Sequence, residues 1–386
     1  MDVTLGEEHE ALRRTVEEFA REVVAPAAPG FDATGNFPYE IVRQMADMGL
    51  FGLPFPECYG GMGGDYFALC LAIEELARAD SSVAITLEAG VGLGAMPLYR
   101  FGNEEQKSHW LPRLCSGTAL GAFGLTEPGG GSDAGGTRTR AEIVDGEWVI
   151  NGSKAFITNA GTDITELVSV TAVTGQRADG RKEISALLVP VPRAGFTAGP
   201  PYSKVGWHAS DTRELAFENC RVPAANLLGE RGRGYANFLS ILDEGRIAIA
   251  ALAVGLAQAC VDASVAFAKE RRSMGRAIAS YQAIAFSIAD MEVRAHTARL
   301  DYYAAAARLL AGQPFKKEAA MAKLYASEIA VTNARAATQV HGGYGVINDY
   351  PVARHWRDSK ILEIGEGTSE VQRILIAREL GLRPSV

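Results

Sequence analysis

The chain has 386 residues, of which 47% are hydrophobic and 22% are charged, so it is long enough for two or three domains with sizeable cores. Its formal net charge of -8 argues against nucleic acid or an anionic membrane as the main partner, because both require a concentrated basic surface. The five cysteines are odd in number and form no CxxC pair, which indicates reduced, mostly buried thiols and a cytoplasmic protein.

The first third of the chain predicts helices. Its N-terminus is acidic and amphipathic and lacks the apolar stretch of a secretory signal, so we expect it to form the first helix of the fold. Helical spacing of apolar residues continues to about residue 120. GVGLGA, at 90–95, follows the strand-like run 83–87 and meets a relaxed dinucleotide fingerprint, but both flanks are helical and Pro97 follows at once. It therefore does not predict a nicotinamide site.

Short segments rich in Val, Ile and Thr begin at about residue 121 and predict a β region. Asp145-Gly146 separates two of them and is a strong hairpin signal, because both residues tolerate positive φ. The region opens with FGLTEPGGGSDAGG, at 123–136, whose glycines expose backbone N–H groups beside the hydroxyls of Thr126 and Ser132. This loop suits a flat, phosphate-bearing cofactor, and a plain surface loop is the alternative.

Helical spacing returns after about residue 228 and predicts long helices near 235–272, 280–310 and 315–340, the last of which ends at Gly342-Gly343. The longest uncharged run, 247–261, is too short to span a membrane. The six histidines show no metal-binding spacing, so we expect no metal site.

EIGEGTSEVQR, at 363–373, interrupts this helical pattern with a charged turn. Thr368 or Ser369 can cap a helix that runs through Val371, and Glu370 suits its positive end. Glu366 lies before the cap, between two glycines, where no helix requires it. A carboxylate on such a turn beside an apolar pocket has the chemistry of a general base.

In this order, the motifs LTEPGGGSD, GSKAFITNAG, ENCRVP, LDEGRIAIAA, ERRSMGRAIASYQAIAF, QVHGGYG and RDSKILEIGEGTSEVQRILIARE resemble the acyl-CoA dehydrogenase family. The resemblance covers essentially the whole chain. It implies an α+β fold with an N-terminal helical domain at 1–120, a middle β-barrel-like domain at 121–227 and a C-terminal four-helix bundle at 228–386. It also implies bound FAD and a homotetramer built as a dimer of dimers.

Carried over to this sequence, the resemblance assigns FAD contacts to the glycine-rich loop, the end of a strand, the QVHGGYG turn and the late turn. These residues are Phe123, Leu125, Thr126, Gly131, Ser132, Phe156, Ile157, Thr158, Arg271, Gln282, Gln339, Val340, Gly342, Gly343, Thr368, Ser369 and Glu370. Phe156 stands where the family usually has Trp. The substrate contacts that the resemblance implies are Ser132, Asp243, Arg246, Gly365 and Gly367.

The resemblance makes Glu366 the catalytic base. It implies that Glu366 removes the C2 proton of an acyl-CoA thioester while flavin N5 accepts a hydride from C3, giving a trans-2-enoyl-CoA. Isovaleryl-CoA dehydrogenases carry their base immediately before an Arg of the C-terminal domain; here Gly245 precedes Arg246, and the neighbouring Glu244 is the only other candidate.

Gly365 is the best indication of the substrate. Straight-chain members usually have Tyr before the catalytic Glu, whereas the isovaleryl type has Gly, so the sequence favours a short or branched acyl chain. The alternatives are a medium straight-chain dehydrogenase, a flavin oxidase or monooxygenase of the same fold, and a non-catalytic acyl-CoA-binding subunit. The expected electron acceptor is an electron-transfer flavoprotein.

Overall fold

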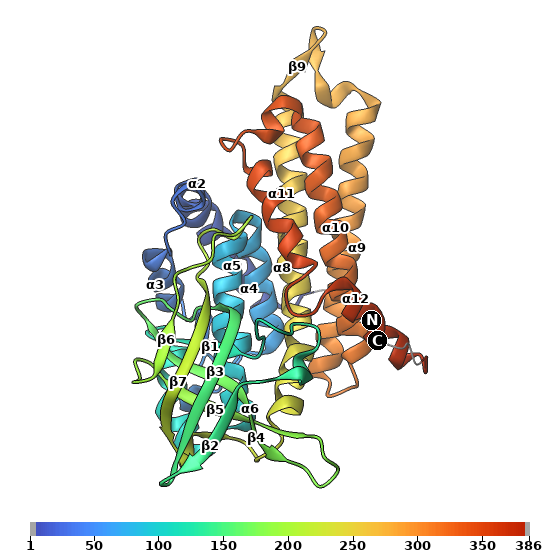
Figure 1. Cartoon of the computed structure of the whole chain (residues 1–386). Coiled ribbons are helices and arrows are strands. Elements are labelled where there is room, and N and C mark those ends of the chain that lie inside the picture. The colour runs from blue at the N-terminus through green and yellow to red at the C-terminus, as the bar shows by residue number, and fades with distance from the viewer. Residues whose placement is uncertain (1–4, 383–386) are drawn as a thin grey trace.

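The computed structural model describes residues 5–382, which divide into a helical region, a β region and a second helical region (Figure 1). The first region contains α1 (Glu7–Phe19), α2 (Ala25–Thr34), α3 (Tyr39–Asp47), α4 (Tyr66–Ala79), α5 (Ser81–Glu88), α6 (Met96–Phe101) and α7 (Glu104–Cys115). Two π-helical segments, Ala20–Val24 and Ala89–Ala95, join α1 to α2 and α5 to α6. The strand-like run 83–87 is therefore helical, and GVGLGA forms a π-helix rather than the turn of a nucleotide-binding unit.

The β region is one twisted sheet with its own buried core (Figure 1). It contains β1 (Leu120–Gly124), β2 (Arg140–Val144), β3 (Glu147–Thr158), β4 (Thr165–Gln176), β5 (Lys182–Pro190), β6 (Phe196–Ala198), β7 (Thr212–Pro223) and β8 (Leu227–Leu228), in the order β6-β7-β3-β2-β4-β5-β8 with β1 beside β4. Asp145 and Gly146 have φ of 53° and 81°, so the predicted tight turn between β2 and β3 is confirmed.

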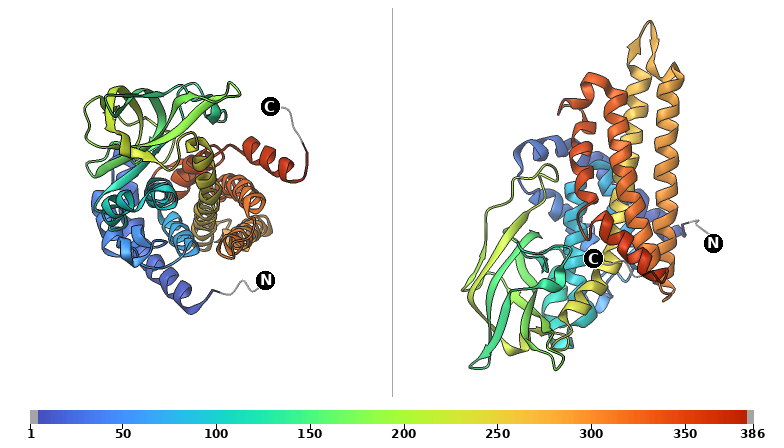
Figure 2. Two further views of the ribbon diagram at one scale, coloured as in Figure 1. Left: turned by 90° about the horizontal axis from the view of Figure 1, so that it is seen from below. Right: turned by 45° about the vertical axis from the view of Figure 1, so that its right-hand side comes forward.

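The C-terminal region is a bundle of α8 (Gly234–Glu270), α9 (Gln282–Leu310), α10 (Lys316–His341) and α11 (Pro351–Leu362), with α12 (Ser369–Glu379) against α10. A two-stranded hairpin of β9 (Arg272–Ser273) and β10 (Arg276–Ala277) projects from the end of the bundle that lies away from α12 (Figures 1 and 2). The helices predicted near 235–272, 280–310 and 315–340 are all present, because long apolar periodicity is a strong local signal.

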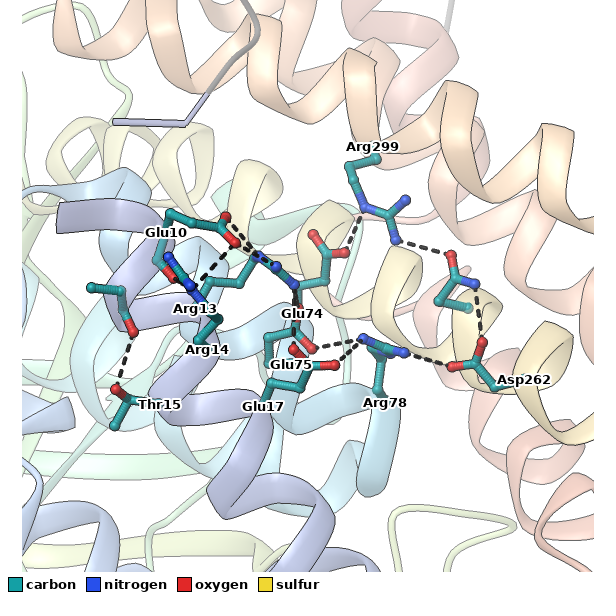
Figure 3. A network of polar contacts seen from close by, with 12 residues as sticks. Glu10, Arg13, Arg14, Thr15, Glu17, Glu74, Glu75, Arg78, Asp262 and Arg299 are labelled. Atoms are coloured by element: carbon teal, nitrogen blue, oxygen red, sulfur yellow. Dashed lines mark hydrogen bonds and ion pairs between the residues drawn. The ribbon is translucent and has the colours of Figure 1, made fainter. Parts of the chain in front are cut away.

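The N-terminal helices and the bundle share one core, in which α4 packs along α8. A network of ion pairs covers the edge of this contact (Figure 3). Arg299 of α9 donates to Glu74 of α4 at 2.7 Å, and Arg78 of α4 donates to Asp262 of α8 at 2.8 Å. Because α4 also contacts α5, this packing fixes the positions of α5 and α8 relative to each other. Both helices carry residues of the candidate site.

Two stretches, Ser81–Phe101 and Gly234–Glu270, are long and apolar enough to cross a membrane by length and composition. Their most apolar windows are 94% and 83% buried inside the protein, as expected of core helices. The five cysteines are unpaired, and all but Cys58 are buried, which confirms the reduced thiols expected from their spacing.

Candidate active site

The turn between α11 and α12 presents Glu366. The residue has φ of 53° and the following Gly367 has φ of 100°, so the chain turns sharply through two left-handed residues. A non-glycine residue in this region costs free energy and persists only where surrounding contacts hold it. Thr368 then caps α12, since its hydroxyl accepts from the N–H of Val371 at 3.3 Å, and the predicted cap is confirmed.

Side chains from two helices hold the turn in place. Lys323 of α10, which is fully buried, donates from Nζ to the Gly367 carbonyl at 2.8 Å. Gln372 of α12 donates to the same carbonyl at 2.9 Å. Neither residue was predicted from sequence, although a lysine inside the small-residue helix AAMAKL is a signal, because a buried amine requires an acceptor.

The Glu366 carboxylate is enclosed. Both its oxygens are buried and accept no hydrogen bond from an N–H or O–H group of the described residues, although the backbone of the turn is partly exposed. Burial raises the pKa of Glu366 to about 7, while the adjacent carboxyl group of Glu88 and the charges of Lys323 and Arg246 act in the opposite direction. A carboxylate with a pKa near neutrality is suited to accepting a proton.

Gly245 of α8 makes room for this carboxylate. A Cβ atom at Gly245 would lie 2.2 Å from Oε2 of Glu366. The neighbouring Glu244 is a weaker candidate base, because Arg100 of α6 holds its carboxylate at 3.0 Å. Arg246 is buried and pairs with Asp243, so the two predicted substrate contacts form one ion pair beside Glu366.

The glycine-rich loop after β1 is fixed by a buried ion pair that sequence reasoning missed. Lys154 of β3 donates to Glu127 at 2.8 Å and to the Leu125 carbonyl at 3.2 Å. Glu127 also accepts from the N–H groups of Arg138 and Thr139, at the far end of the loop. Burial lowers the pKa of Lys154 to about 8, against the effect of Glu127. Both residues lie inside the motifs LTEPGGGSD and GSKAFITNAG, which was the available signal.

The predicted cofactor contacts of the β region lie at the ends of β1 and β3. Phe156 has φ of 61° and is 65% exposed, so its ring lies on the surface next to Tyr202, with ring centres 5.3 Å apart. Ile157 is buried, and Thr158 and Thr126 are partly buried. Phe123 stacks on Phe238 of α8, with ring centres 4.0 Å apart. Gly131 and Ser132 lie on the loop, where both are exposed.

A second group of predicted cofactor contacts lines a groove at the distal end of the bundle. The groove has a volume of about 750 Å³ and includes Arg271, Val340, Gly342 and Gly343. His341 in its wall stacks on Phe267, with ring centres 4.2 Å apart. In Figure 1 this end of the bundle, marked by β9, lies far from α12, so one chain does not bring both groups together. Gln282 begins α9 next to this groove, and Gln339 is exposed one residue before it.

A separate open hollow of about 770 Å³ lies on the β region, beside the loop that ends at Thr137. Arg138, Arg140 and Lys182 line it, with Glu142 as the only acidic residue. Such a surface suits an anionic ligand such as a phosphate.

Three domain families match the chain in sequence. The acyl-CoA dehydrogenase N-terminal domain matches residues 6–118, the middle domain residues 122–220 and the C-terminal domain residues 232–381. The chain belongs to the acyl-CoA dehydrogenase family. It is therefore an oxidoreductase that depends on FAD and acts on acyl-CoA thioesters, and the predicted fold class is confirmed.

Relatives of this acyl-CoA dehydrogenase are similar over their whole length. The "Probable acyl-CoA dehydrogenase YngJ" of Bacillus subtilis is 52% identical over 98% of this chain and 100% of its own. A short-chain-specific acyl-CoA dehydrogenase of Clostridium acetobutylicum is 42% identical, with 98% and 100% covered. The solved butyryl-CoA dehydrogenase of Megasphaera elsdenii is 41% identical with a TM-score of 0.95, and the comparison covers 98% of this chain and 100% of that one.

The residues present fit FAD. A Cβ atom at Gly342 or Gly343 would meet no other atom within 4 Å, so the groove edge is open to a ligand, and Arg271 supplies a cation for a diphosphate. The exposed Phe156 ring, held in a left-handed conformation, offers a flat apolar surface to an aromatic ring.

Proposed function

We propose that this acyl-CoA dehydrogenase converts a short or branched-chain acyl-CoA to the trans-2-enoyl-CoA, with Glu366 as the base. The observation that carries the proposal is the buried Glu366 carboxylate, which accepts from no N–H and from no Ser, Thr or Tyr hydroxyl of the described residues and has a pKa raised to about 7. The names of the short-chain-specific relatives and of butyryl-CoA dehydrogenase support the short acyl chain.

The proton removed in this reaction comes from C2, next to the thioester carbonyl. That proton becomes acidic only when the carbonyl oxygen accepts hydrogen bonds. Among the described residues, the backbone N–H of Glu366 donates to no protein acceptor, so it is available for that oxygen. Glu366 then takes the proton on its carboxylate and becomes neutral, a form that its buried position favours.

When bound, FAD supplies the acceptor for the hydride that leaves C3. We assign its isoalloxazine side to Thr126, Phe156 and Thr158, with Phe123, Leu125, Gly131, Ser132, Ile157, Thr368, Ser369 and Glu370 around it. The groove with Arg271 lies at the other end of the bundle, so we propose that Arg271, Gln282, Gln339, Val340, Gly342 and Gly343 bind the FAD of a partner subunit in a homotetramer.

We propose that CoA contacts Ser132, Asp243 and Arg246, and that the acyl chain passes Gly365 and Gly367. The loop that contains Ser132 meets the start of α8, where a Cβ atom at Gly135 would lie 3.5 Å from the Tyr235 hydroxyl. A chain from a solved structure titled "Electron transferring flavoprotein of Acidaminococcus fermentans" is 41% identical with a TM-score of 0.95. This supports an electron-transfer flavoprotein as the acceptor. We also propose that the enzyme is cytoplasmic, as its unpaired cysteines suggest.

The test is anaerobic titration of the FAD-loaded enzyme with short straight and branched acyl-CoAs, following loss of the flavin absorbance. Glu366→Gln should retain yellow FAD and lose the bleaching, by a factor of about 10³ or more in rate, because the amide cannot accept the proton. Bleaching of Glu366→Gln at the wild-type rate would show that another group is the base. Rapid reoxidation of the reduced wild-type flavin by O₂ would instead indicate an oxidase.

A further inference from the structure

Glu88 is a second buried carboxyl group beside Glu366. It is the last residue of α5 and is completely buried, and its carboxyl group lies close enough to that of Glu366 for each to change the pKa of the other. Gly92 in the following π-helix leaves space for it, since a Cβ atom there would lie 2.7 Å from Oε1 of Glu88 and 3.5 Å from the Tyr66 hydroxyl. Neither the general base assignment nor the cofactor contacts require a carboxyl group at this position.

The two carboxyl groups need a shared proton. Within residues 5–382, none of their four oxygens accepts from an N–H or O–H group of any residue outside the pair, and the buried Tyr66 hydroxyl is also without a partner. Two ionised carboxylates side by side in a buried site repel each other, so the pair is favourable only when one of them carries a proton that it can donate to the other.

The surrounding charges decide which group carries that proton. Lys323 of α10 and Arg246 of α8 act on Glu366, whereas the groups near Glu88 are the Glu366 carboxylate and the neutral Tyr66 and Cys70 of α4. The nearby Glu244 is neutralised by its ion pair with Arg100. Burial and the charge of Glu366 raise the pKa of Glu88 well above its usual value. Glu88 is therefore the neutral partner and Glu366 the ionised one.

We propose that Glu88 is a positioning residue of the active site, which in its neutral form donates a hydrogen bond to the Glu366 carboxylate and keeps that base ionised and in place. The inference rests on Glu366 being the base. It adds that the ionisation of the base is controlled by a residue more than 270 positions earlier in the chain, on a helix of the N-terminal region.

The experiment compares Glu88→Ala and Glu88→Gln in the FAD-loaded enzyme, with the rate of flavin bleaching by butyryl-CoA measured against pH. Alanine removes the donor, so the pH midpoint of the rate should rise by roughly one to two units, since a hydrogen bond to a charged group is worth that much. Glutamine still donates through its amide N–H₂, so its midpoint should stay close to that of the wild type. A purely structural role for Glu88 would not separate the two variants in this way.

Infrared titration gives a readout that does not depend on activity. The wild-type minus Glu88→Gln difference spectrum at neutral pH should contain the C=O band of one neutral carboxyl group; the difference removes the bands of other buried carboxyl groups such as Asp358, whose pKa burial raises to about 7. The inference is overturned if Glu88→Ala has the wild-type midpoint, or if the difference spectrum contains no such band. If Glu88→Ala loses FAD, the infrared result on Glu88→Gln alone tests whether Glu88 carries the proton. Bleaching by Glu366→Gln would overturn the base assignment itself, which is a separate outcome.

Discussion

Glu366 and Gly365 are adjacent residues of the turn: Glu366 places a side chain in a buried space, whereas Gly365 leaves a space empty. The Glu366 side chain enters a buried space from a left-handed backbone, and Lys323 and Gln372 hold the following carbonyl. Among the described residues other than its two chain neighbours, the only atom within 4 Å of a Cβ position at Gly365 is the Ile361 carbonyl oxygen, at 3.6 Å. The space beside Gly365 is therefore open to a side chain, or to a substituent of the substrate.

Gly365→Tyr should narrow the space available to a branched acyl chain. We expect kcat/KM for isovaleryl-CoA to fall by about tenfold or more relative to that for butyryl-CoA, because a pocket that must exclude a methyl group discriminates by this amount. Steady-state kinetics with both substrates is the measurement, and Gly365→Ala is the control, since a methyl group fits. An equal loss on both substrates would remove Gly365 as a determinant of substrate shape.

The glycine-rich loop is an element whose conformation depends on one buried ion pair. Glu127 accepts from two backbone N–H groups at the end of the loop, and Lys154 ties Glu127 to the adjoining strand. Glycines allow the loop to approach a cofactor closely but do not fix its shape. The ion pair therefore fixes the conformation of the loop, which the glycines alone would leave flexible.

Glu127→Gln should lower the Tm of the FAD-loaded enzyme by roughly 5 °C and weaken FAD retention, because it leaves the buried Lys154 charge without its partner. The double variant Glu127→Gln/Lys154→Met should lose less Tm than the two single variants together, since no unpaired charge remains. Thermal unfolding and flavin content after gel filtration are the measurements. If the loss of Tm in the double variant equals the sum of the losses in the two single variants, Glu127 and Lys154 are not coupled.

At the scale of the whole molecule, α9 carries an exposed apolar stripe. Phe286, Val293 and Leu300 recur every seven residues on one face of the helix and are 62%, 64% and 37% exposed. Large apolar residues that repeat on the outer face of a bundle are typical of an interface with another subunit. The groove at the distal end of the same bundle contains only some of the predicted FAD contacts; those at the ends of β1 and β3 and at the turn before α12 lie elsewhere in the chain. Both features fit the proposed homotetramer.

Val293→Glu should dissociate this assembly and reduce FAD content, because it places a charge in an apolar interface and separates the two halves of the cofactor site. Light scattering after gel filtration gives the mass, and absorbance gives the flavin. Ile143→Glu is the matched control, since Ile143 is 51% exposed on β2, away from α9. A Val293→Glu protein of unchanged mass would place the interface elsewhere.

The sequence by itself determined the order of helical, β and helical regions, the Asp145-Gly146 hairpin, a helix cap at Thr368 or Ser369 and the family, because these depend on local periodicity, turn chemistry and ordered motifs. The exact domain boundaries and the individual cofactor contacts stay predictions. Tertiary structure alone decided that Glu88, Lys323 and Gly245 meet Glu366 and that Arg100 holds Glu244. Glu88, Lys323, Gly245 and Arg100 lie on four different helices, and their spacing along the chain does not predict the packing that buries them together. Burial then changes their chemistry, since a carboxyl group acquires a raised pKa only where folding has removed water from it.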